Sequence, residues 1–184
     1  INEHEQGAYT GEISAAMLKS IGVQYTLVGH SERRQYYNET NASCAAKLTA
    51  AIKHQIIPVY CIGETLSERE ANKHFDVVSE QLAALKVLSA EEMSSCIVAY
   101  EPVWAIGTGV TASAEQANEM HIHIRKTIAT LFNQSIADAV AILYGGSVKP
   151  DNAQALFSMS DIDGGLIGGA ALSSRDFINI AKGF

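Results

Sequence analysis

The sequence predicts an α/β fold, a parallel sheet with helices between its strands. Short apolar segments alternate with longer amphipathic ones along the chain, which is the order expected of βα units. The apolar segments are continuous rather than alternating, which is typical of parallel strands buried on both faces. Polar and glycine-rich residues follow strand after strand at the same end. That placement favours a (β/α) barrel over an open, doubly wound sheet.

Five segments are predicted as strands. They cover residues 25–29, 56–62, 96–100, 140–144 and 164–167. The residues that immediately follow them are unusual for surface turns: His30, Glu64, Glu101, Gly145–Ser147 and Gly168–Gly169. Because the carboxyl ends of parallel strands meet at one edge of a sheet, we expect these residues to lie together.

Helix signals fill the intervals between the strands. Capping boxes are predicted at Ser67 with Glu70 and at Ser113 with Gln116. Asn41, Asp151 and Ser14 are predicted to cap three further helices. Two buried stripes at helical spacing follow the capping boxes: Ala71, Phe75, Val78, Leu82 and Leu85, then Ala117, Met120, Ile124, Ile128 and Leu131.

Composition narrows the class of protein. The chain has 184 residues, is 47% hydrophobic and carries a net charge of -7, so we expect one domain over residues 1–184. The acidic balance argues against nucleic acid and anionic membranes as partners. No apolar run approaches the length that crosses a bilayer. Cys44, Cys61 and Cys96 form no CxxC pair, so buried thiols in a reducing compartment are favoured over disulfides or zinc.

No cofactor and no metal site are predicted. HExxH, P-loop and GxSxG motifs do not occur in the sequence. His121 and His123 stand two apart on a predicted helix and point in different directions, so they cannot share a metal ion. Residues 107–112 fit G-x-G-x-x-A, but the first glycine lies too far from the strand end for a dinucleotide fingerprint. Asp161 and Asp163 are expected to flank the start of a strand rather than bind calcium.

Glu101 is the first candidate for chemistry. It directly follows a buried strand, and stiff residues (Pro102–Trp104) then small ones (105–109) separate it from the next helix. This pattern describes a lid with a hinge at each side. A lid that excludes water beside a carboxylate suits a general base that removes a proton from carbon. The alternative is a strand-end charge that simply reaches solvent.

His30 is the second candidate. It ends one strand, and Ser31-Glu32-Arg33 starts a predicted helix. The positive end of a helix dipole biases a histidine towards its neutral form, which can donate a hydrogen bond to a carbonyl oxygen. A base with a neutral electrophile is the pair needed to form an enediolate. A structural or solvated histidine is the alternative.

Two glycine pairs suggest an anion site. "LYGGSV" and "GLIGGA" each place adjacent glycines after a strand and before a helix. Backbone N–H groups of two such loops can form a phosphate cradle, which an acidic protein can use because it relies on dipoles rather than cations. Tight turns alone would explain either pair separately.

Five motifs together resemble the triosephosphate isomerase family: "VGHSERR", "CIGE", "AYEPVWAIGTG", "YGGSV" and "DIDGGLIGGA", in this order and spacing. The resemblance runs from about Gly7 to the end. It implies a (β/α)8 TIM barrel and a cytoplasmic enzyme of glycolysis and gluconeogenesis that needs no cofactor. Such an enzyme interconverts dihydroxyacetone phosphate and D-glyceraldehyde 3-phosphate through an enediolate.

The resemblance also implies roles for individual residues. Glu101 would be the base, His30 the electrophile and Glu32 a supporting carboxylate. The backbone N–H groups of Gly107, Ser147, Gly168 and Gly169 would hold the substrate phosphate, beneath a lid over residues 102–112. Thr10 would reach the partner's active site in a homodimer, with Glu12 and Arg33 paired across the interface.

The sequence departs from the family pattern at its front. It supplies about five of the eight βα units, and barrels of this class run to roughly 250 residues, so about 65 residues are expected to precede it. The family's active-site asparagine and lysine would lie in that segment. Val110 stands where many members carry lysine, with little effect expected. Two alternatives stay open here: another phosphate-binding barrel, which would need a Schiff-base lysine, or a non-enzymatic fragment such as one piece of a split barrel.

Overall fold

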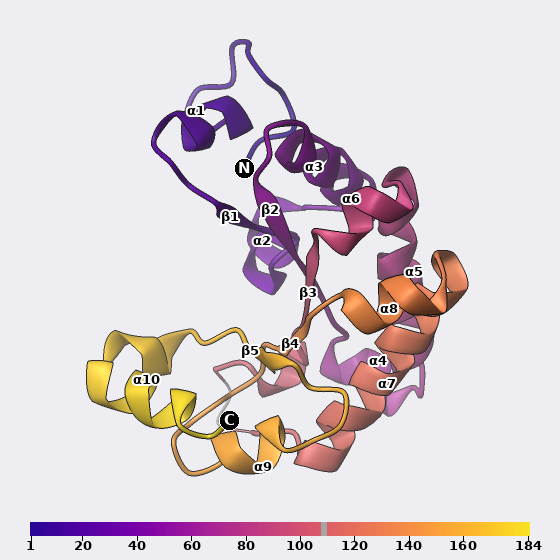
Figure 1. Ribbon diagram of the computed structural model, residues 1–184, viewed down its shortest axis with the longest axis vertical. Helices are drawn as coiled ribbons and strands as arrows, with labels where there is room; N and C mark the ends of the chain where they lie inside the picture. The colour runs from indigo at the N-terminus through magenta and orange to yellow at the C-terminus, as the bar shows by residue number, and fades with distance from the viewer. Residues whose placement is uncertain (108–109) are drawn as a thin grey trace.

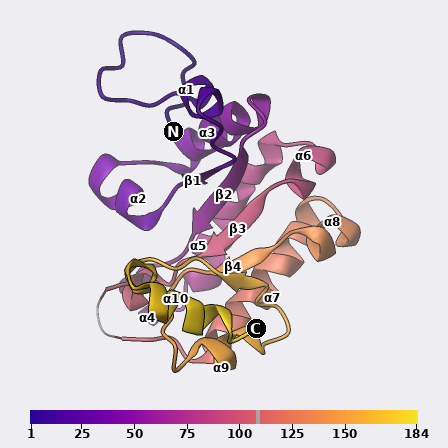
Figure 2. The same cartoon turned by 60° about the vertical axis from the view of Figure 1, so that its left-hand side comes forward.

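A parallel five-stranded sheet organises the chain. The computed structural model describes residues 1–107 and 110–184. The strands follow the order β1-β2-β3-β4-β5 across the sheet (Figures 1 and 2), with bounds Tyr25–Val28, Ile57–Ile62, Ile97–Tyr100, Ile142–Tyr144 and Gly164–Gly165. All five predicted strands are confirmed. They are shorter than predicted, most of all the last two.

Both faces of the sheet are apolar, which explains the continuous apolar runs in the sequence. Tyr60 on β2 lies beside Val98 on β3, and Val98 lies beside Ile142 on β4. These three side chains belong to the main core beneath the helices. Alternate residues, among them Cys61 and Ala99, form a smaller buried cluster with Val59.

Helices connect successive strands, and most of the large ones lie on one side of the sheet. Figure 1 shows α3, α5, α6, α7 and α8 there. The α-helices are α1 (Ala15–Ser20), α2 (Ser31–Tyr37), α3 (Asn41–Lys53), α4 (Leu66–Glu70), α5 (His74–Leu82), α6 (Ala90–Ser94), α7 (Ala114–Leu131), α8 (Gln134–Ala139), α9 (Ala153–Phe157) and α10 (Ser174–Ala181). Short 3-10 helices are η1 (Ala83–Val87), η2 (Val103–Ala105) and η3 (Gly169–Leu172).

Two of the five expected helix starts are present and three differ. The capping box of Ser113 with Gln116 and the cap at Ser14 are confirmed. The box at Ser67 is wrong, because Thr65 caps α4 and pairs reciprocally with Glu68. The predicted caps at Asn41 and Asp151 each fall one residue from the observed N-caps, Thr40 and Asn152.

The helix predicted after residue 67 is interrupted. α4 ends at Glu70, and Asn72 takes a left-handed conformation with φ 55° before α5 begins. Ala71 is consequently exposed, whereas Val78, Leu82 and Leu85 are buried as expected. The second predicted stripe is buried along α7 up to Ile128.

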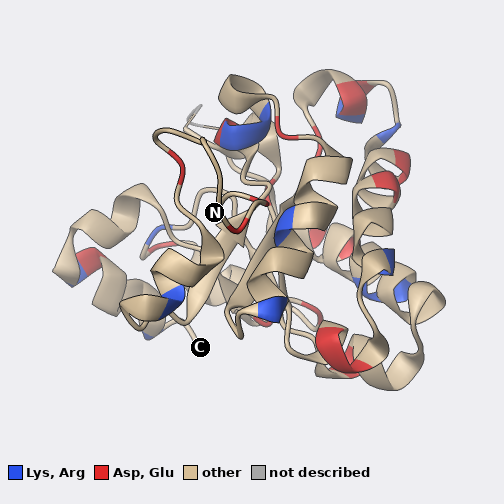
Figure 3. Ribbon diagram, turned by 90° about the horizontal axis from the view of Figure 1, so that it is seen from above, with Lys and Arg blue, Asp and Glu red and all other residues tan. Residues whose placement is uncertain are grey.

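Surface and thiol chemistry follow the composition. Cys44, Cys61 and Cys96 are free and buried. Figure 3 shows acidic and basic residues scattered over the helices. Within residues 1–107 and 110–184, no helix has the length and apolar character required to cross a membrane.

His121 on α7 is fully buried and has a structural environment of its own. Its ring meets Tyr100 edge-on at 5.8 Å, and Nδ1 lies 3.1 Å from the carbonyl oxygen of Asp161. Burial lowers the pKa of His121 to about 4. Between its lowered pKa and the ordinary histidine pKa, His121 is therefore neutral in the folded protein but protonated in the unfolded chain.

Acid should weaken the fold through His121. Between the ordinary histidine pKa of about 6.5 and pH 4 only the unfolded chain binds this proton, so the free energy of unfolding falls as the pH falls, by up to about 3 kcal/mol. Urea unfolding at pH 7 and pH 4.5 measures the loss. His121→Gln should show a smaller pH dependence than the parent, and His4→Gln, at an exposed position, serves as the control. An equal loss in parent and His121→Gln would contradict the prediction.

Candidate active site

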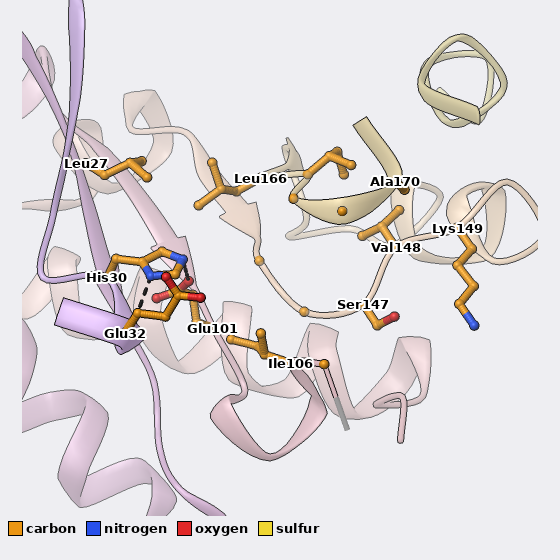
Figure 4. Close-up of a pocket in the computed structure, with 16 residues that line it drawn as sticks. Leu27, His30, Glu32, Glu101, Ile106, Ser147, Val148, Lys149, Leu166 and Ala170 are labelled. Atoms are coloured by element: carbon orange, nitrogen blue, oxygen red, sulfur yellow. Dashed lines mark hydrogen bonds and ion pairs between the residues drawn. The ribbon is translucent and has the colours of Figure 1, made fainter. Parts of the chain in front are cut away.

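A cavity of about 440 Å³ lies where the parallel strands end. It brings together every residue predicted to be catalytic or to bind phosphate: His30, Glu32, Glu101, Gly107, Ser147, Gly168 and Gly169. Figure 4 shows His30, Glu32 and Glu101 grouped at one side, with Ser147 and Lys149 at the other. Leu27, Ile106, Leu166 and Ile167 supply apolar walls that the sequence analysis did not assign.

Glu101 immediately follows β3 and is 2% exposed. Its Oε1 lies 2.9 Å from Nε2 of His30. Its Oε2 accepts the backbone N–H of Ser31 at 3.0 Å, at the first turn of α2. A helix N-terminus and an imidazole therefore hold the carboxylate at the cavity wall.

Two glycines lie close to Glu101, Gly63 against its main chain and Gly145 against its side chain. Its N–H donates to the carbonyl of Ile62 at 2.7 Å. A Cβ on Gly63 would overlap the carbonyl group of Glu101, and a Cβ on Gly145 would lie 2.9 Å from Glu101 Cγ. The glycines after β2 and β4 are thus required by the close approach of this one residue.

His30 is the N-cap of α2. Its Nδ1 accepts the backbone N–H of Glu32 at 3.3 Å, so a single proton on Nε2, donated to Glu101, satisfies both ring nitrogens. The hydrogen bond to Glu101 raises the pKa of His30, opposed by burial. The helix dipole considered from the sequence is therefore countered by a carboxylate while Glu101 occupies this position.

The glycine-rich loops open onto the cavity from the opposite side. Among the described atoms, none lies within 4 Å of a Cβ built on Gly107, Gly168 or Gly169, so a ligand could approach these backbones closely. Gly107 also has φ 67°, which favours glycine. Ser147 follows β4 and enters the same space.

Glu64 was expected beside the other strand-end residues, but it does not line the cavity and lies behind it, against the residues that follow Glu101. It is fully buried, and its Oε1 accepts hydrogen bonds from Arg69 at 3.0 Å, the Tyr100 hydroxyl at 3.1 Å and Trp104 Nε1 at 2.8 Å. Its carbonyl accepts the N–H of Val103. Glu64 thus fastens the beginning of the predicted lid. Thr108 and Gly109 of that lid lie outside the described residues.

The three residues predicted at a subunit interface lie outside the cavity lining. Thr10 and Glu12 are exposed, and Glu12 accepts a hydrogen bond from Asn2 at 2.8 Å. Arg33 pairs with Glu39, which Lys47 also contacts. A pair between Glu12 and Arg33 of two subunits stays a prediction.

Other acidic and histidine candidates have structural partners. Asp161 and Asp163, just before β5, both pair with Arg125, as expected of residues that flank a strand start. His123 contacts Ser79, apart from the His121 environment. Within the described part of the chain, no three His, Cys, Asp or Glu side chains gather as a metal site.

The fold and site define a class: α/β enzymes with an acid–imidazole pair and a glycine-lined pocket at the carboxyl ends of parallel strands. A family model described as triosephosphate isomerase matches residues 1–184. The chain belongs to the triosephosphate isomerase family. It is an aldose–ketose isomerase, and its five-stranded sheet is consistent with part of a (β/α)8 barrel.

Relatives support this assignment over the whole chain. The triosephosphate isomerase of Cytophaga hutchinsonii is 55% identical over 185 residues, which cover 100% of this chain and 74% of the relative. That of Porphyromonas gingivalis is 52% identical over 183 residues, covering 99% and 73%. That of Bacteroides fragilis is 54% identical over 182 residues, covering 99% and 72%.

Proposed function

We propose that this chain carries the proton-transfer centre that interconverts dihydroxyacetone phosphate and D-glyceraldehyde 3-phosphate, with Glu101 as base and His30 as electrophile. One observation carries the proposal: Glu101 Oε1 and His30 Nε2 lie 2.9 Å apart in a cavity that also contains the glycine-rich loops. Isomerisation needs a base for a carbon-bound proton and a donor for the neighbouring carbonyl oxygen.

The two residues would exchange partners when substrate binds. Glu101 leaves Ser31 and His30, turns into the cavity and takes a proton from the carbon beside the carbonyl. His30 Nε2–H, released from Glu101, donates to the carbonyl oxygen as it becomes the enediolate oxygen. Glu101 then returns a proton to the former carbonyl carbon, while the hydroxyl proton on the neighbouring oxygen passes to the former carbonyl oxygen by way of His30 Nε2. One proton has then moved between the carbons and one between the oxygens, so the isomerisation balances. Glu32 would be a supporting carboxylate at the cavity wall, and its backbone N–H donates to His30 Nδ1.

The phosphate would lie against the opposite wall. Backbone N–H groups of Gly107, Ser147, Gly168 and Gly169 can converge on an anion without a cation. Lys149 is the cationic side chain of the lining, and in Figure 4 its ammonium points away from His30 and Glu101. This orientation gives no support to a Schiff-base enzyme. Residues 102–112 would close over the bound substrate, with Glu64 holding the first hinge through Trp104.

We also propose a cellular location, a pathway and an oligomeric state for the protein. The family points to a cytoplasmic enzyme of glycolysis and gluconeogenesis that acts as a homodimer, with Thr10, Glu12 and Arg33 at the subunit contact. Residues 1–184 would form one barrel domain together with a preceding segment. The chain spans 74% of the length of the Cytophaga relative.

Solvent deuterium should enter the product if a base transfers the proton. The enzyme for this test is a chimaera, in which the part of the Cytophaga relative that this chain does not span is joined to residues 1–184. Dihydroxyacetone phosphate turned over in deuterium oxide should give glyceraldehyde 3-phosphate with deuterium on the carbon that receives the proton, detected by NMR or mass spectrometry. His30→Gln should lower the rate of exchange and isomerisation together. Isomerisation with no deuterium incorporated would indicate hydride transfer and refute the role of Glu101.

A further inference from the structure

The side chain of Gln81 lies beneath the site and pairs with the backbone of a single residue. Gly63 N–H donates to Gln81 Oε1 at 2.7 Å, and Gln81 Nε2 donates to the Gly63 carbonyl at 3.0 Å. Gly63 lies one residue beyond the end of β2, so the hydrogen-bond ladder between the strands does not include its backbone. The buried amide of Gln81 takes the place of a neighbouring strand.

Gln81 is itself held in place. It lies in the last turn of α5, and the buried Tyr60 hydroxyl donates to its backbone carbonyl at 2.7 Å. Tyr60 belongs to β2. Two sets of hydrogen bonds therefore join the end of α5 to β2 and the residue after it: Tyr60 with the Gln81 carbonyl, and Gly63 with the Gln81 amide. The Gln81 amide is therefore a fixed support for Gly63.

Gly63 in turn lies directly against the main chain of Glu101. The two backbones approach so closely that a Cβ on Gly63 would overlap the Glu101 carbonyl. The adjacent Ile62 carbonyl accepts the N–H of Glu101 at 2.7 Å. Any shift of the chain at residues 62–63 must consequently move the main chain of Glu101.

We propose that Gln81 is a positioning residue for Glu101 and acts through Gly63. The inference rests on the proposed function, because it concerns the base of that reaction. Gln81 does not line the cavity and takes no part in proton transfer. Displacement of a reacting group by 1 Å can cost about 10²-fold in rate, so a partial displacement after loss of the amide should cost about tenfold.

The first test is Gln81→Met in the chimaera, which keeps the length of the side chain and removes both hydrogen bonds. We expect kcat to fall about tenfold. KM should stay within about twofold, because the phosphate loops come from other parts of the chain. Glu80→Met, at the exposed neighbouring position on the same helix, is the matched control and should retain the parent kcat. A folded Gln81→Met variant with the parent kcat would overturn the proposal.

A second variant separates positioning from general loss of stability. A protonated glutamic acid presents one acceptor and one donor, as glutamine does, whereas the carboxylate lacks the donor. Burial raises the pKa of such a carboxyl group. For Gln81→Glu, the ratio of its kcat to that of the parent should therefore rise towards one as the pH falls. A ratio independent of pH would count against the proposal, even if Gln81→Met does not fold.

A third readout needs no turnover. Contact with Glu101 raises the pKa of His30, so displacement of Glu101 in Gln81→Met should lower it, as followed by NMR on the chimaera without substrate. An unchanged His30 pKa would oppose the proposal. An inactive parent chimaera would instead refute the proposed function, while an active parent with unaffected Gln81 variants would refute only the positioning role.

Discussion

Glu101→Asp is expected to lower kcat of the chimaera by about a hundredfold, since the shorter side chain withdraws the carboxylate by about one methylene. The main chain cannot follow the carboxylate, because Gly63 lies directly against the Glu101 carbonyl group. KM should change little, since the phosphate loops are untouched. Initial rates at saturating substrate, measured in both directions, give the comparison.

The control for this experiment is Glu80→Asp, the same chemical change at an exposed position on α5. It should match the parent within about twofold. Far-UV circular dichroism and melting curves establish that all three proteins are folded. A Glu101→Asp enzyme within twofold of the parent would show that the base lies elsewhere.

The polypeptide of residues 1–184, made by itself, is expected to show no isomerase turnover above a no-enzyme control. The described sheet has free edges at β1 and β5, and an open edge invites association. Tyr25 and Leu27 on β1 are 53% and 41% exposed, and Leu172 beside α10 is 93% exposed. The resemblance also assigns an active-site asparagine and lysine to a segment that these residues do not include.

Size-exclusion chromatography and a coupled isomerase assay test this expectation on protein of verified mass. The polypeptide should elute as associated species, and the unspanned part of the Cytophaga relative, added as a separate chain, should restore turnover. The chimaera provides the positive control. Turnover near that of the chimaera from residues 1–184 alone would show that the segment, with its asparagine and lysine, is dispensable.

The order of strands could be predicted because parallel strands buried on both faces must be apolar throughout. Their ends could not, since pairing depends on the neighbour. Ladder pairing at β5 stops after Gly165, although Leu166 and Ile167 continue the apolar run. The cap at Ser67 failed because two hydroxyl residues compete, and Thr65 has Glu68 at the correct spacing.

Most of the candidate site could be predicted because its residues follow strands directly. The proximity of Glu101 and His30 follows from their places at strand ends, but the hydrogen bonds of the Glu101 carboxylate to His30 and Ser31 depend on side-chain rotamers that the sequence does not specify. The direction of the pKa shift of His30 could not be predicted either. The sequence shows the helix that follows His30, but it does not show the contact with the Glu101 carboxylate that raises the pKa. Gln81 carried no signal, because a single amide within an amphipathic helix is typical of a solvent-facing position.

The enclosure of Glu101 by Gly63 and Gly145 limits how the base can move. With its main chain fixed, the carboxylate passes from the Ser31 N–H to the cavity only by rotation about its side-chain bonds. Glu101 is 2% exposed, so the picosecond-to-nanosecond rotamer changes of exposed side chains do not describe this rotation. The carboxylate must first give up its hydrogen bonds to Ser31 and His30, so its rotation is tied to the arrival of new partners in the cavity.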